Sequence, residues 1–233
     1  MDDELALEDV LRSAARLQHA VPDAVLVGGT AAAVHAHHRV SFDHDHVLSD
    51  LAQRYAEVLE AVEASEGWVT SVRASSPPLT LLGSLAGIEA GLRQLRRTRP
   101  LEVEQYDLPG GESVRVPTLS EMLRVKAFLI VQRNVTRDYL DTVALADRLG
   151  VRSATDVLVE IDEYYADRSR THGSVLTALV ARLAEPSPRD VRVTGQLASY
   201  KGLNPRWHDW DSVVVACRGL ADHLLRAVEG GLT

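Results

Sequence analysis

The feature that most constrains the fold is a hydrophobic segment that runs into two glycines and is followed by a pair of acids. The segment reads Val25-Leu-Val-Gly28-Gly29-Thr30, and after an alanine-rich stretch comes Arg39-Val-Ser41-Phe-Asp43-His-Asp45. This order predicts a short buried strand, a glycine turn, a helix and a second strand. Because side chains alternate along a strand, Asp43 and Asp45 should project from the same face.

Two neighbouring carboxylates repel each other, and a divalent cation between them relieves the repulsion. Oxygen ligands suit Mg²⁺, which usually completes its shell with substrate phosphates. The helix after Gly28 and Gly29 should begin with free N–H groups and the positive end of its dipole. The residues therefore predict a Mg²⁺ site beside a phosphate site, as a nucleoside triphosphate requires.

The same segment resembles the AbiEii/AbiGii abortive-infection toxins, which belong to the nucleotidyltransferase superfamily of the DNA polymerase β type. Their hallmark is a hydrophobic strand, G-G-T-A, a helix and then S-x-D-x-D. A second matching stretch holds Lys126 on a helix and then Arg137-Asp138. A weaker third match is Tyr200-Lys-Gly-Leu, with Trp207 and Trp210 after it. The resemblance covers roughly residues 20 to 215.

The resemblance implies an α/β fold, in which a nucleotidyltransferase-type mixed sheet with flanking helices is followed by a mainly α-helical C-terminal region. It implies Mg²⁺-dependent transfer of a nucleotide, with Mn²⁺ as an alternative metal. The donor would be a nucleoside triphosphate, and the acceptor an RNA such as the 3′ end of tRNA, or a protein hydroxyl. It also implies the toxin of a type IV-like toxin–antitoxin system, with a cognate antitoxin protein as partner.

Site residues are expected at the matching positions. The catalytic set is Asp43, Asp45, Lys126 and Asp138, with Asp43 and Asp45 as metal ligands. The nucleotide- and phosphate-binding set is Gly28, Gly29, Thr30, Arg39, Ser41 and Lys126. By the resemblance, Lys126 contacts the triphosphate as a compact ammonium, while Asp138 orients Lys126 or acts on the acceptor hydroxyl. Asp141, one helical turn further on, is the reserve for Asp138.

One departure from the superfamily concerns a third carboxylate, which many members hold on a later strand. The matching stretch here is Gly87-Ile-Glu89-Ala-Gly91, with glycine where the acid is expected. Glu89, two residues before Gly91, would project from the same face of the strand and could replace the missing acid. Glu102 and Glu104 are further alternatives for the third carboxylate. The number of metal ions is left open.

Composition excludes several other classes of protein. The chain has 233 residues, of which 45% are hydrophobic, enough for a core. No apolar run reaches the ~18 residues of a membrane span. The acidic start, Met1-Asp-Asp-Glu-Leu, is unlike a secretory signal. The single cysteine, Cys217, cannot form an internal disulfide. We therefore expect a cytoplasmic protein with no membrane partner.

Charge gives a mixed indication about nucleic acids. A net charge of −8 argues against a general nucleic-acid binder. Arg93, Arg96, Arg97 and Arg99 nevertheless fall within seven positions. Such a cluster indicates either a surface that binds phosphates or a solvated face. The resemblance implies that a phosphate-binding surface here would dock tRNA.

The predicted elements divide the chain near Pro117 into a nucleotidyltransferase α/β domain, residues 1–117, and a helical domain that completes the active site, residues 118–233. Strands are predicted at residues 25–27, 42–48, 68–74, 80–85, 88–95, 101–106 and 113–116. Helices are predicted at residues 4–18, 30–37, 51–64, 121–132, 136–149, 155–167, 174–184 and 210–228.

Two other functions compete with nucleotidyl transfer. Five histidines crowd into twelve positions and could hold zinc or iron in a metal-dependent hydrolase: His35, His37, His38, His44 and His46. On a strand, however, His44 and His46 should point away from the face of Asp43 and Asp45. The chain could also be a catalytically inactive nucleotide-binding partner, although the presence of Asp43, Asp45 and Lys126 argues against this.

Overall fold

The computed structural model describes residues 2–230, with side chains from Leu7 onward. The chain forms two compact units. One, here called the sheet unit, holds the residues up to Val34 and Val40–Thr118. The other, the helical unit, holds His35–Arg39 and the residues from Leu119 onward. Residues 35–39 thus group with the helical unit, although they lie within the first predicted domain.

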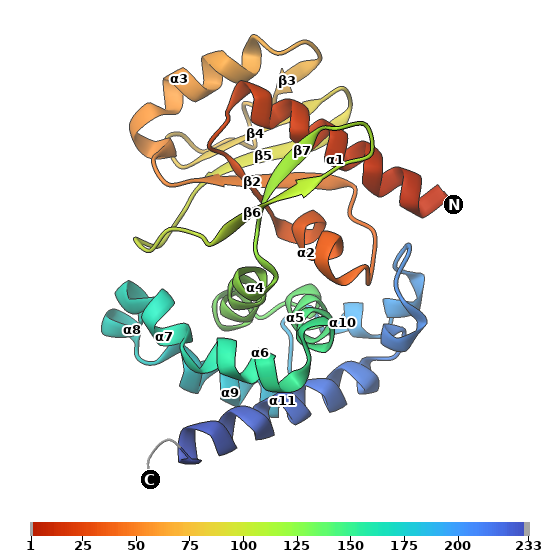
Figure 1. Ribbon diagram of the computed structural model, residues 1–233, viewed down its shortest axis with the longest axis vertical. Helices are drawn as coiled ribbons and strands as arrows, with labels where there is room; N and C mark the ends of the chain where they lie inside the picture. The colour runs from red at the N-terminus through yellow and green to blue at the C-terminus, as the bar shows by residue number, and fades with distance from the viewer. Residues whose placement is uncertain (1, 231–233) are drawn as a thin grey trace. The chain divides into compact units, whose positions relative to one another are not determined.

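The sheet unit is built on a five-stranded sheet of order β1-β2-β5-β4-β3. Its strands are β1 (Val25–Val27), β2 (Asp43–Leu48), β3 (Trp68–Thr70), β4 (Thr80–Leu85) and β5 (Ile88–Gln94). β2 and β5 are parallel and the other neighbours are antiparallel, so the sheet is mixed. β6 (Val103–Asp107) and β7 (Ser113–Pro117) pair as a separate hairpin (Figure 1).

One face of this sheet is covered by helices. The residues that α1 (Asp2–Ala20), α3 (Leu51–Glu63) and the strands bury together include Leu17, Val21, Leu48, Leu51, Val58, Val62, Leu81, Leu85 and Leu92. Strand alternation places Leu48 with His44 and His46 on the covered face. It leaves Asp43 and Asp45 on the opposite face. α2 (Gly28–Ala36) connects β1 to β2.

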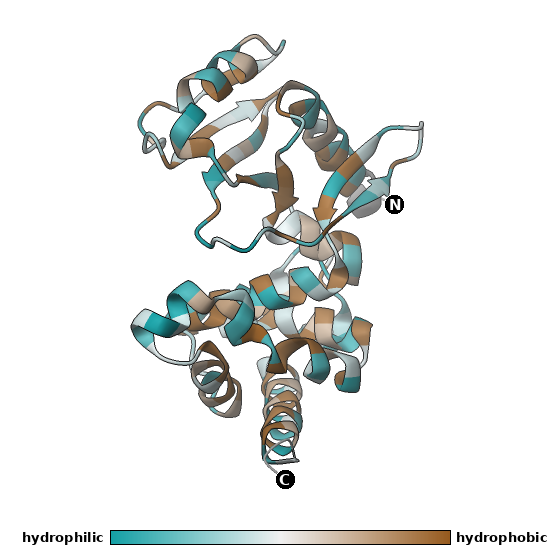
Figure 2. Cartoon of the chain, turned by 60° about the vertical axis from the view of Figure 1, so that its left-hand side comes forward, coloured by the Kyte–Doolittle hydropathy of each residue, from teal (hydrophilic) through white to brown (hydrophobic). Residues whose placement is uncertain are grey.

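The helical unit contains α4 (Leu119–Arg133), α5 (Thr136–Leu149), α6 (Val151–Val159), α7 (Ile161–Tyr164), α8 (Ala166–His172), α9 (Val175–Ala184), α10 (Val191–Thr194) and α11 (Trp210–Gly230). Short 3₁₀ turns lie at Leu197–Ser199 and Pro205–Trp207. α11 contacts α5, α6 and α9 and buries Val213, Cys217, Leu220 and Leu224. Brown and teal alternate along α11 in Figure 2, as amphipathic packing requires.

The predicted fold class is confirmed: a mixed α/β sheet is followed by a helical region. Several boundaries were wrong. α2 begins at Gly28 rather than Thr30, so the glycine turn, in which Gly28 has a φ of +77°, belongs to the first turn of this element. The strand predicted over residues 68–74 ends at Thr70. The helix predicted over residues 155–167 is broken into parts of α6, α7 and α8.

None of the helices in the described part of the chain combines the length and the apolar character needed to cross a membrane.

Candidate active site

The uncovered face of the sheet presents two rows of side chains. The first row crosses four neighbouring strands, β2, β5, β4 and β3. Its residues, in that order, are Asp43, Glu89, Ser84 and Val69. In the next row, Asp45 lies beside Gly91 and Gly91 beside Leu82. Paired residues of adjacent strands point to the same face. The two predicted metal ligands are therefore one pleat apart on a shared face, with Glu89 next to Asp43.

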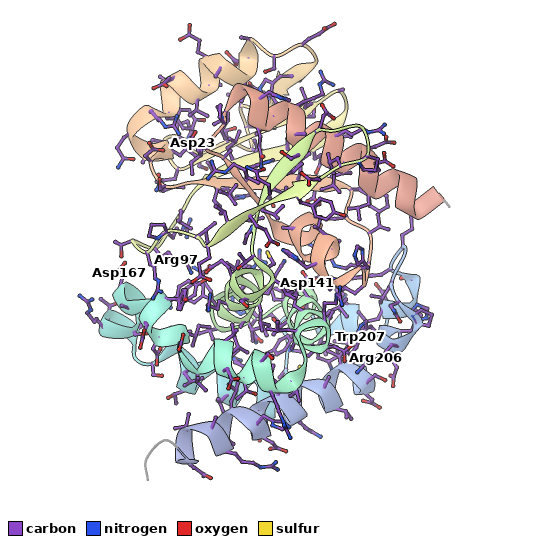
Figure 3. The ribbon with its side chains drawn as sticks, in the orientation of Figure 1. Asp23, Arg97, Asp141, Asp167, Arg206 and Trp207 are labelled. Atoms are coloured by element: carbon purple, nitrogen blue, oxygen red, sulfur yellow. The ribbon has the colours of Figure 1, made fainter. Side chains whose placement is uncertain are left out.

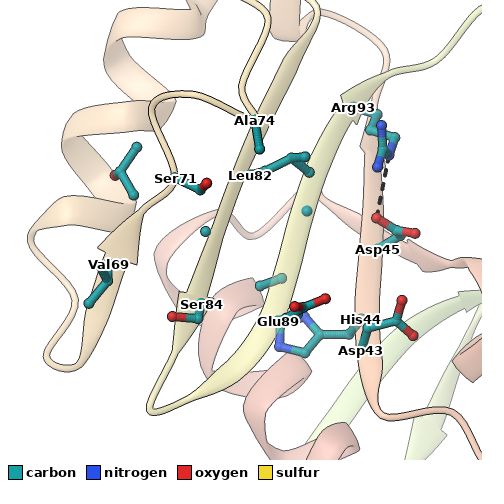
Figure 4. A pocket seen from close by; sticks show the side chains of 14 residues that line it. Asp43, His44, Asp45, Val69, Ser71, Ala74, Leu82, Ser84, Glu89 and Arg93 are labelled. Carbon is teal, nitrogen blue, oxygen red and sulfur yellow. Dashed lines mark hydrogen bonds and ion pairs between the residues drawn. The ribbon is translucent and has the colours of Figure 1, made fainter.

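These rows form the floor of a cavity of about 510 Å³ within the sheet unit. A cavity of this size is in the range that binds small ligands, ~300–1,000 Å³. Figure 4 shows the strands that contribute to it, with Asp43 and Asp45 on one strand. Its lining is Asp43, His44, Asp45, Val69, Thr70, Ser71, Ala74, Leu82, Gly83, Ser84, Glu89, Ala90, Gly91 and Arg93.

Asp43 is held by two hydroxyl residues from the expected phosphate-binding set. Ser41 Oγ donates a hydrogen bond to Asp43 Oδ1 at 2.8 Å. Thr30 Oγ1 donates to the backbone oxygen of Asp43. Both hydroxyl residues are buried. In this structure Ser41 positions the carboxylate and Thr30 positions the backbone of Asp43. The contact of either hydroxyl with a phosphate stays a prediction.

Two glycines leave the space that Asp45 occupies. A Cβ atom on Gly28 would lie 3.4 Å from Asp45 Cβ. A Cβ atom on Gly91 would lie only 2.5 Å from Asp45 Oδ1. Any side chain at position 91 would therefore displace the Asp45 carboxylate. The position where a third acid was expected is therefore occupied by a glycine that leaves room for Asp45 in this structure.

Arg93 is a member of the site that the sequence did not indicate as such. Its Nε lies 3.4 Å from Asp45 Oδ1, and Figure 4 shows the side chain reaching toward that carboxylate. Because alternate side chains of a strand share a face, Arg93, two residues after Gly91 on β5, projects from this face. It was predicted only as a member of the arginine cluster.

The four arginines of the cluster differ in their surroundings. Arg93 lines the cavity. Arg97 is buried and donates to the backbone oxygens of Arg99 and Pro100 at 2.8 and 3.0 Å, so it stabilises its own loop. Arg96 and Arg99 are exposed.

The residues present at Asp43 and Asp45 fit a hard divalent cation. Their donors are carboxylate oxygens from same-face positions, and the Asp45 side chain is 34% exposed in the cavity. Across residues 2–230, no group of three or more His, Cys, Asp or Glu side chains is placed to hold a metal. Two carboxylates with substrate oxygens are nevertheless a usual shell for Mg²⁺.

Two of the clustered histidines lie on the covered face of the sheet, as strand alternation predicted. His44 Nε2 lies 3.0 Å from Ser13 Oγ of α1. Burial lowers the pKa of His44 to about 4, with Asp43 acting weakly in the opposite direction. Burial also holds the pKa of His46 well below its usual value, and His44 adds to this effect. Both side chains are buried. Strand alternation directs them to the face opposite the Asp43 and Asp45 side chains, although His44 is among the residues that line the cavity.

Within the helical unit, Asp141 is the centre of a buried charged cluster. Lys126 Nζ lies 2.7 Å from Asp141 Oδ2. Arg39 donates from Nε to Oδ1 at 2.8 Å and from Nη2 to Oδ2 at 3.1 Å. His38 Nε2 lies 2.7 Å from Oδ1. Figure 3 labels Asp141 among α4 and α5. Each of the four side chains is buried.

The cations of this cluster set its protonation states. Burial alone would raise the pKa of Asp141, but Arg39 and Lys126, with the His38 hydrogen bond, hold it well below its usual range. Burial lowers the pKa of His38 and outweighs the opposite effect of Asp141. His38 is therefore neutral near pH 7. Because a carboxylate only accepts, His38 carries its proton on Nε2.

Asp138 is not a partner of Lys126 in this structure. It is fully buried and forms an ion pair with Arg133, at 2.6 Å between Oδ1 and Nη2. Its reserve, Asp141, has the orienting position instead. Arg39, which was expected in the phosphate-binding set, also pairs with Asp141 in this structure. A role of Asp138 toward an acceptor hydroxyl stays a prediction.

Similarity to solved structures identifies the fold. The nucleotidyltransferase toxin MenT4 of Mycobacterium tuberculosis aligns with a TM-score of 0.53 and 17% identity, over 94% of this chain and 83% of that one. JHP933 of Helicobacter pylori aligns with a TM-score of 0.52 and 15% identity, over 97% and 94%. The chain has the nucleotidyltransferase fold. The antibiotic-resistance factor ANT(2'')-Ia aligns with a TM-score of 0.52 and 12% identity, over 73% of this chain and 98% of that one.

Similarity in sequence points to a part of much longer proteins. The mycolic acid-containing lipids exporter MmpL11 of Mycolicibacterium smegmatis is 35% identical over 134 residues, which are 56% of this chain and 13% of the exporter. The heme uptake protein MmpL11 of M. tuberculosis is 38% identical over 96 residues, 41% of this chain and 10% of that protein. The chain thus spans about a tenth of the length of these curated relatives. No family model matches the chain.

Proposed function

We propose that this chain is a Mg²⁺-dependent nucleotidyltransferase. The observation that carries the proposal is the pair Asp43 and Asp45 on the floor of an open cavity, in a chain with the nucleotidyltransferase fold. The cation would be held by these two carboxylates and would neutralise charge on the triphosphate during transfer.

In the proposed step, an acceptor hydroxyl oxygen forms a bond to the α-phosphorus of the nucleoside triphosphate. The bond from the α-phosphorus to the bridging oxygen breaks, pyrophosphate leaves with the electron pair, and the hydroxyl proton passes to water. Such a displacement depends mostly on positioning and charge stabilisation. Ser41 and Thr30 contribute by fixing Asp43. Gly28 and Gly91 contribute by leaving room for Asp45.

The acceptor belongs to the same proposal. Because of its resemblance to the AbiEii toxins, and because MenT4 is a toxin with a similar fold, we propose an RNA acceptor, with the 3′ end of tRNA favoured over a protein hydroxyl. We also propose that the chain is the toxin of a toxin–antitoxin pair, neutralised by a cognate antitoxin protein.

The direct test is transfer of label from a nucleoside triphosphate marked at its α-phosphate. The wild-type chain, Mg²⁺ and each of the four triphosphates are incubated with total tRNA or total protein. We expect labelled tRNA. Asp43→Asn should lower the rate by at least a hundredfold, because one of the two metal ligands is lost.

The control is Asp222→Asn, which changes an exposed acid on α11 and should keep the wild-type rate. Normal transfer by Asp43→Asn would show that the mechanism does not need the acidic pair. Nucleotide binding by the wild type without any transfer would favour the inactive-partner alternative.

The same assay tests Lys126, which the resemblance assigns to the triphosphate. Lys126→Gln should lower the rate severely. If it raises only the KM for the nucleotide and leaves kcat unchanged, Lys126 binds substrate equally in the ground and transition states.

A further inference from the structure

The uncovered sheet face carries an arginine close to the position where a third acid would stand. Along β5, Glu89, Gly91 and Arg93 share the face of Asp43 and Asp45. Gly91 lies directly beside Asp45, and a Cβ atom there would come within 2.5 Å of Asp45 Oδ1 and 2.9 Å of Leu82 Cδ2. A carboxylate at this position is therefore sterically incompatible with the observed position of Asp45.

The next residue on that face is Arg93, and it pairs with Asp45 at 3.4 Å. The charged side chains that line the cavity are three acids, Asp43, Asp45 and Glu89, and one permanent cation, Arg93. Asp45 therefore has a positive partner before any metal ion arrives. Asp43, by contrast, accepts a hydrogen bond from the Ser41 hydroxyl. Its neighbour on β5 is Glu89, which carries the same charge.

The Arg93–Asp45 contact is easily broken. The Arg93 side chain is 46% exposed and that of Asp45 is 34% exposed. Ion pairs of this exposure contribute little to stability, because water screens both charges. A divalent cation that takes Asp45 as a ligand would also repel the guanidinium. Arg93 would then be left in an acidic cavity and would need a new anionic partner.

We propose that Arg93 is a phosphate-binding residue of the proposed transfer, and that it exchanges Asp45 for the triphosphate when metal and nucleotide bind. This inference rests on the proposed function, and it adds a cation from the sheet unit to the metal and to Lys126, which the resemblance assigns to the triphosphate. A guanidinium suits this role because its planar N–H donors match phosphate oxygens in pairs.

The exchange predicts two opposite effects of removing Arg93. Metal alone should bind more tightly, because Asp45 no longer has a competing partner. Metal with nucleotide should bind more weakly, because the phosphate loses a charged donor. A side chain that serves only to stabilise the sheet would not shift the two affinities in opposite directions.

The experiment measures Mn²⁺ binding by electron paramagnetic resonance, without nucleotide, and binding of each α,β-methylene nucleoside triphosphate with Mn²⁺ by calorimetry. Arg93→Gln should lower the Kd for Mn²⁺ about two- to fivefold and raise the Kd for the nucleotide about tenfold or more. Arg93→Lys should restore the wild-type Mn²⁺ affinity and only part of the nucleotide affinity. Arg12→Gln is the matched control, because Arg12 pairs with Glu8 on the surface of α1, outside the cavity.

The inference is wrong if Arg93→Gln binds Mn²⁺ as the wild type does, or if Arg12→Gln shifts the two affinities as Arg93→Gln does. It is also wrong if Arg93→Gln strengthens, or weakens, the binding of both Mn²⁺ and the nucleotide. These outcomes are separate from the failure of the proposed function, because they require no turnover. If the wild-type chain transfers label while Arg93→Gln matches it in both binding assays, the function stands and the role of Arg93 does not.

Discussion

At the residue scale, the position of Asp45 depends on the absence of a side chain at Gly91. The Gly91→Ala variant should push the Asp45 carboxylate out of place, because the added methyl group would overlap Asp45 Oδ1 and crowd Leu82. We expect Mn²⁺ affinity and the transfer rate to fall at least tenfold. The measurement is Mn²⁺ binding alongside thermal unfolding, which should show that the fold is retained.

Gly219→Ala is the matched control for that change. Gly219 lies in α11, and an added Cβ atom would meet nothing within 4 Å. This substitution should stabilise the chain by about 0.5–1 kcal/mol, since alanine is the better helix former. If Gly91→Ala binds Mn²⁺ as the wild type does, the close approach of Gly91 has no bearing on the site.

Single residues also show what sequence reasoning can and cannot predict about the site. Period two along a strand was enough to place Asp43 and Asp45 on one face, because that relation is local. The pairing of His38 with Asp141 joins residues 103 positions apart. No local pattern distinguished Asp141 from Asp138, since both are acids in α5 and both are buried. Only the tertiary arrangement of the helices decides between them.

At the scale of elements, Asp162 joins α7 to the start of α9. Its Oδ1 accepts hydrogen bonds from Ser169 Oγ at 2.8 Å and from the backbone N–H of Val175 at 2.5 Å. Its Oδ2 accepts from Ser174 Oγ at 2.6 Å. Asp162→Ala should lower the free energy of unfolding by about 1–2 kcal/mol, as the loss of a helix cap does. Urea unfolding measures this, and Asp156→Ala, at an exposed position of α6, should change stability by less. Equal effects of the two changes would show that the Asp162 contacts are not stabilising.

The same region shows why the helix predicted over residues 155–167 was wrong. Residues 151–172 contain neither glycine nor proline, so nothing in the sequence indicates a break. The break places Ile161, Tyr164 and Tyr165 in buried positions. Tyr165 stacks on Phe128 of α4 with 3.9 Å between ring centroids. Tertiary packing of these side chains outweighs helix propensity, which is a weak local preference. By contrast, β1 and β4 were predicted correctly because their boundaries follow clear turn residues.

At the scale of the whole molecule, buried neutral histidines make stability depend on pH. The folded-state pKa of His38 is lowered by burial, whereas in the unfolded chain it returns to about 6.5. As pH falls below about 6.5, the unfolded state therefore binds a proton that the folded state does not, and stability decreases. The charged groups that face His38 are Asp141, Arg39 and Lys126.

We expect the free energy of unfolding to fall between pH 7.5 and pH 5, and to fall less steeply in His38→Gln, which keeps an N–H donor but cannot take up a proton. The slope difference is at most ~1.4 kcal/mol per pH unit for one proton. His44 and His46 contribute equally in both proteins. His172→Gln, at an exposed site of α8, should follow the wild-type curve. Parallel curves for His38→Gln and the wild type would show that folding does not lower the pKa of His38.

The proposed function depends most on joint binding of a divalent cation by Asp43 and Asp45, with the nucleotide completing the metal shell. The most direct measurement is Mn²⁺ binding by electron paramagnetic resonance, with and without an α,β-methylene nucleoside triphosphate, for the wild type, Asp43→Asn and Asp45→Asn. We predict one Mn²⁺ site in the wild type that tightens with nucleotide, and a loss of at least tenfold in affinity in each variant. Wild-type Mn²⁺ affinity in both variants, or no effect of nucleotide on the wild type, would contradict the account.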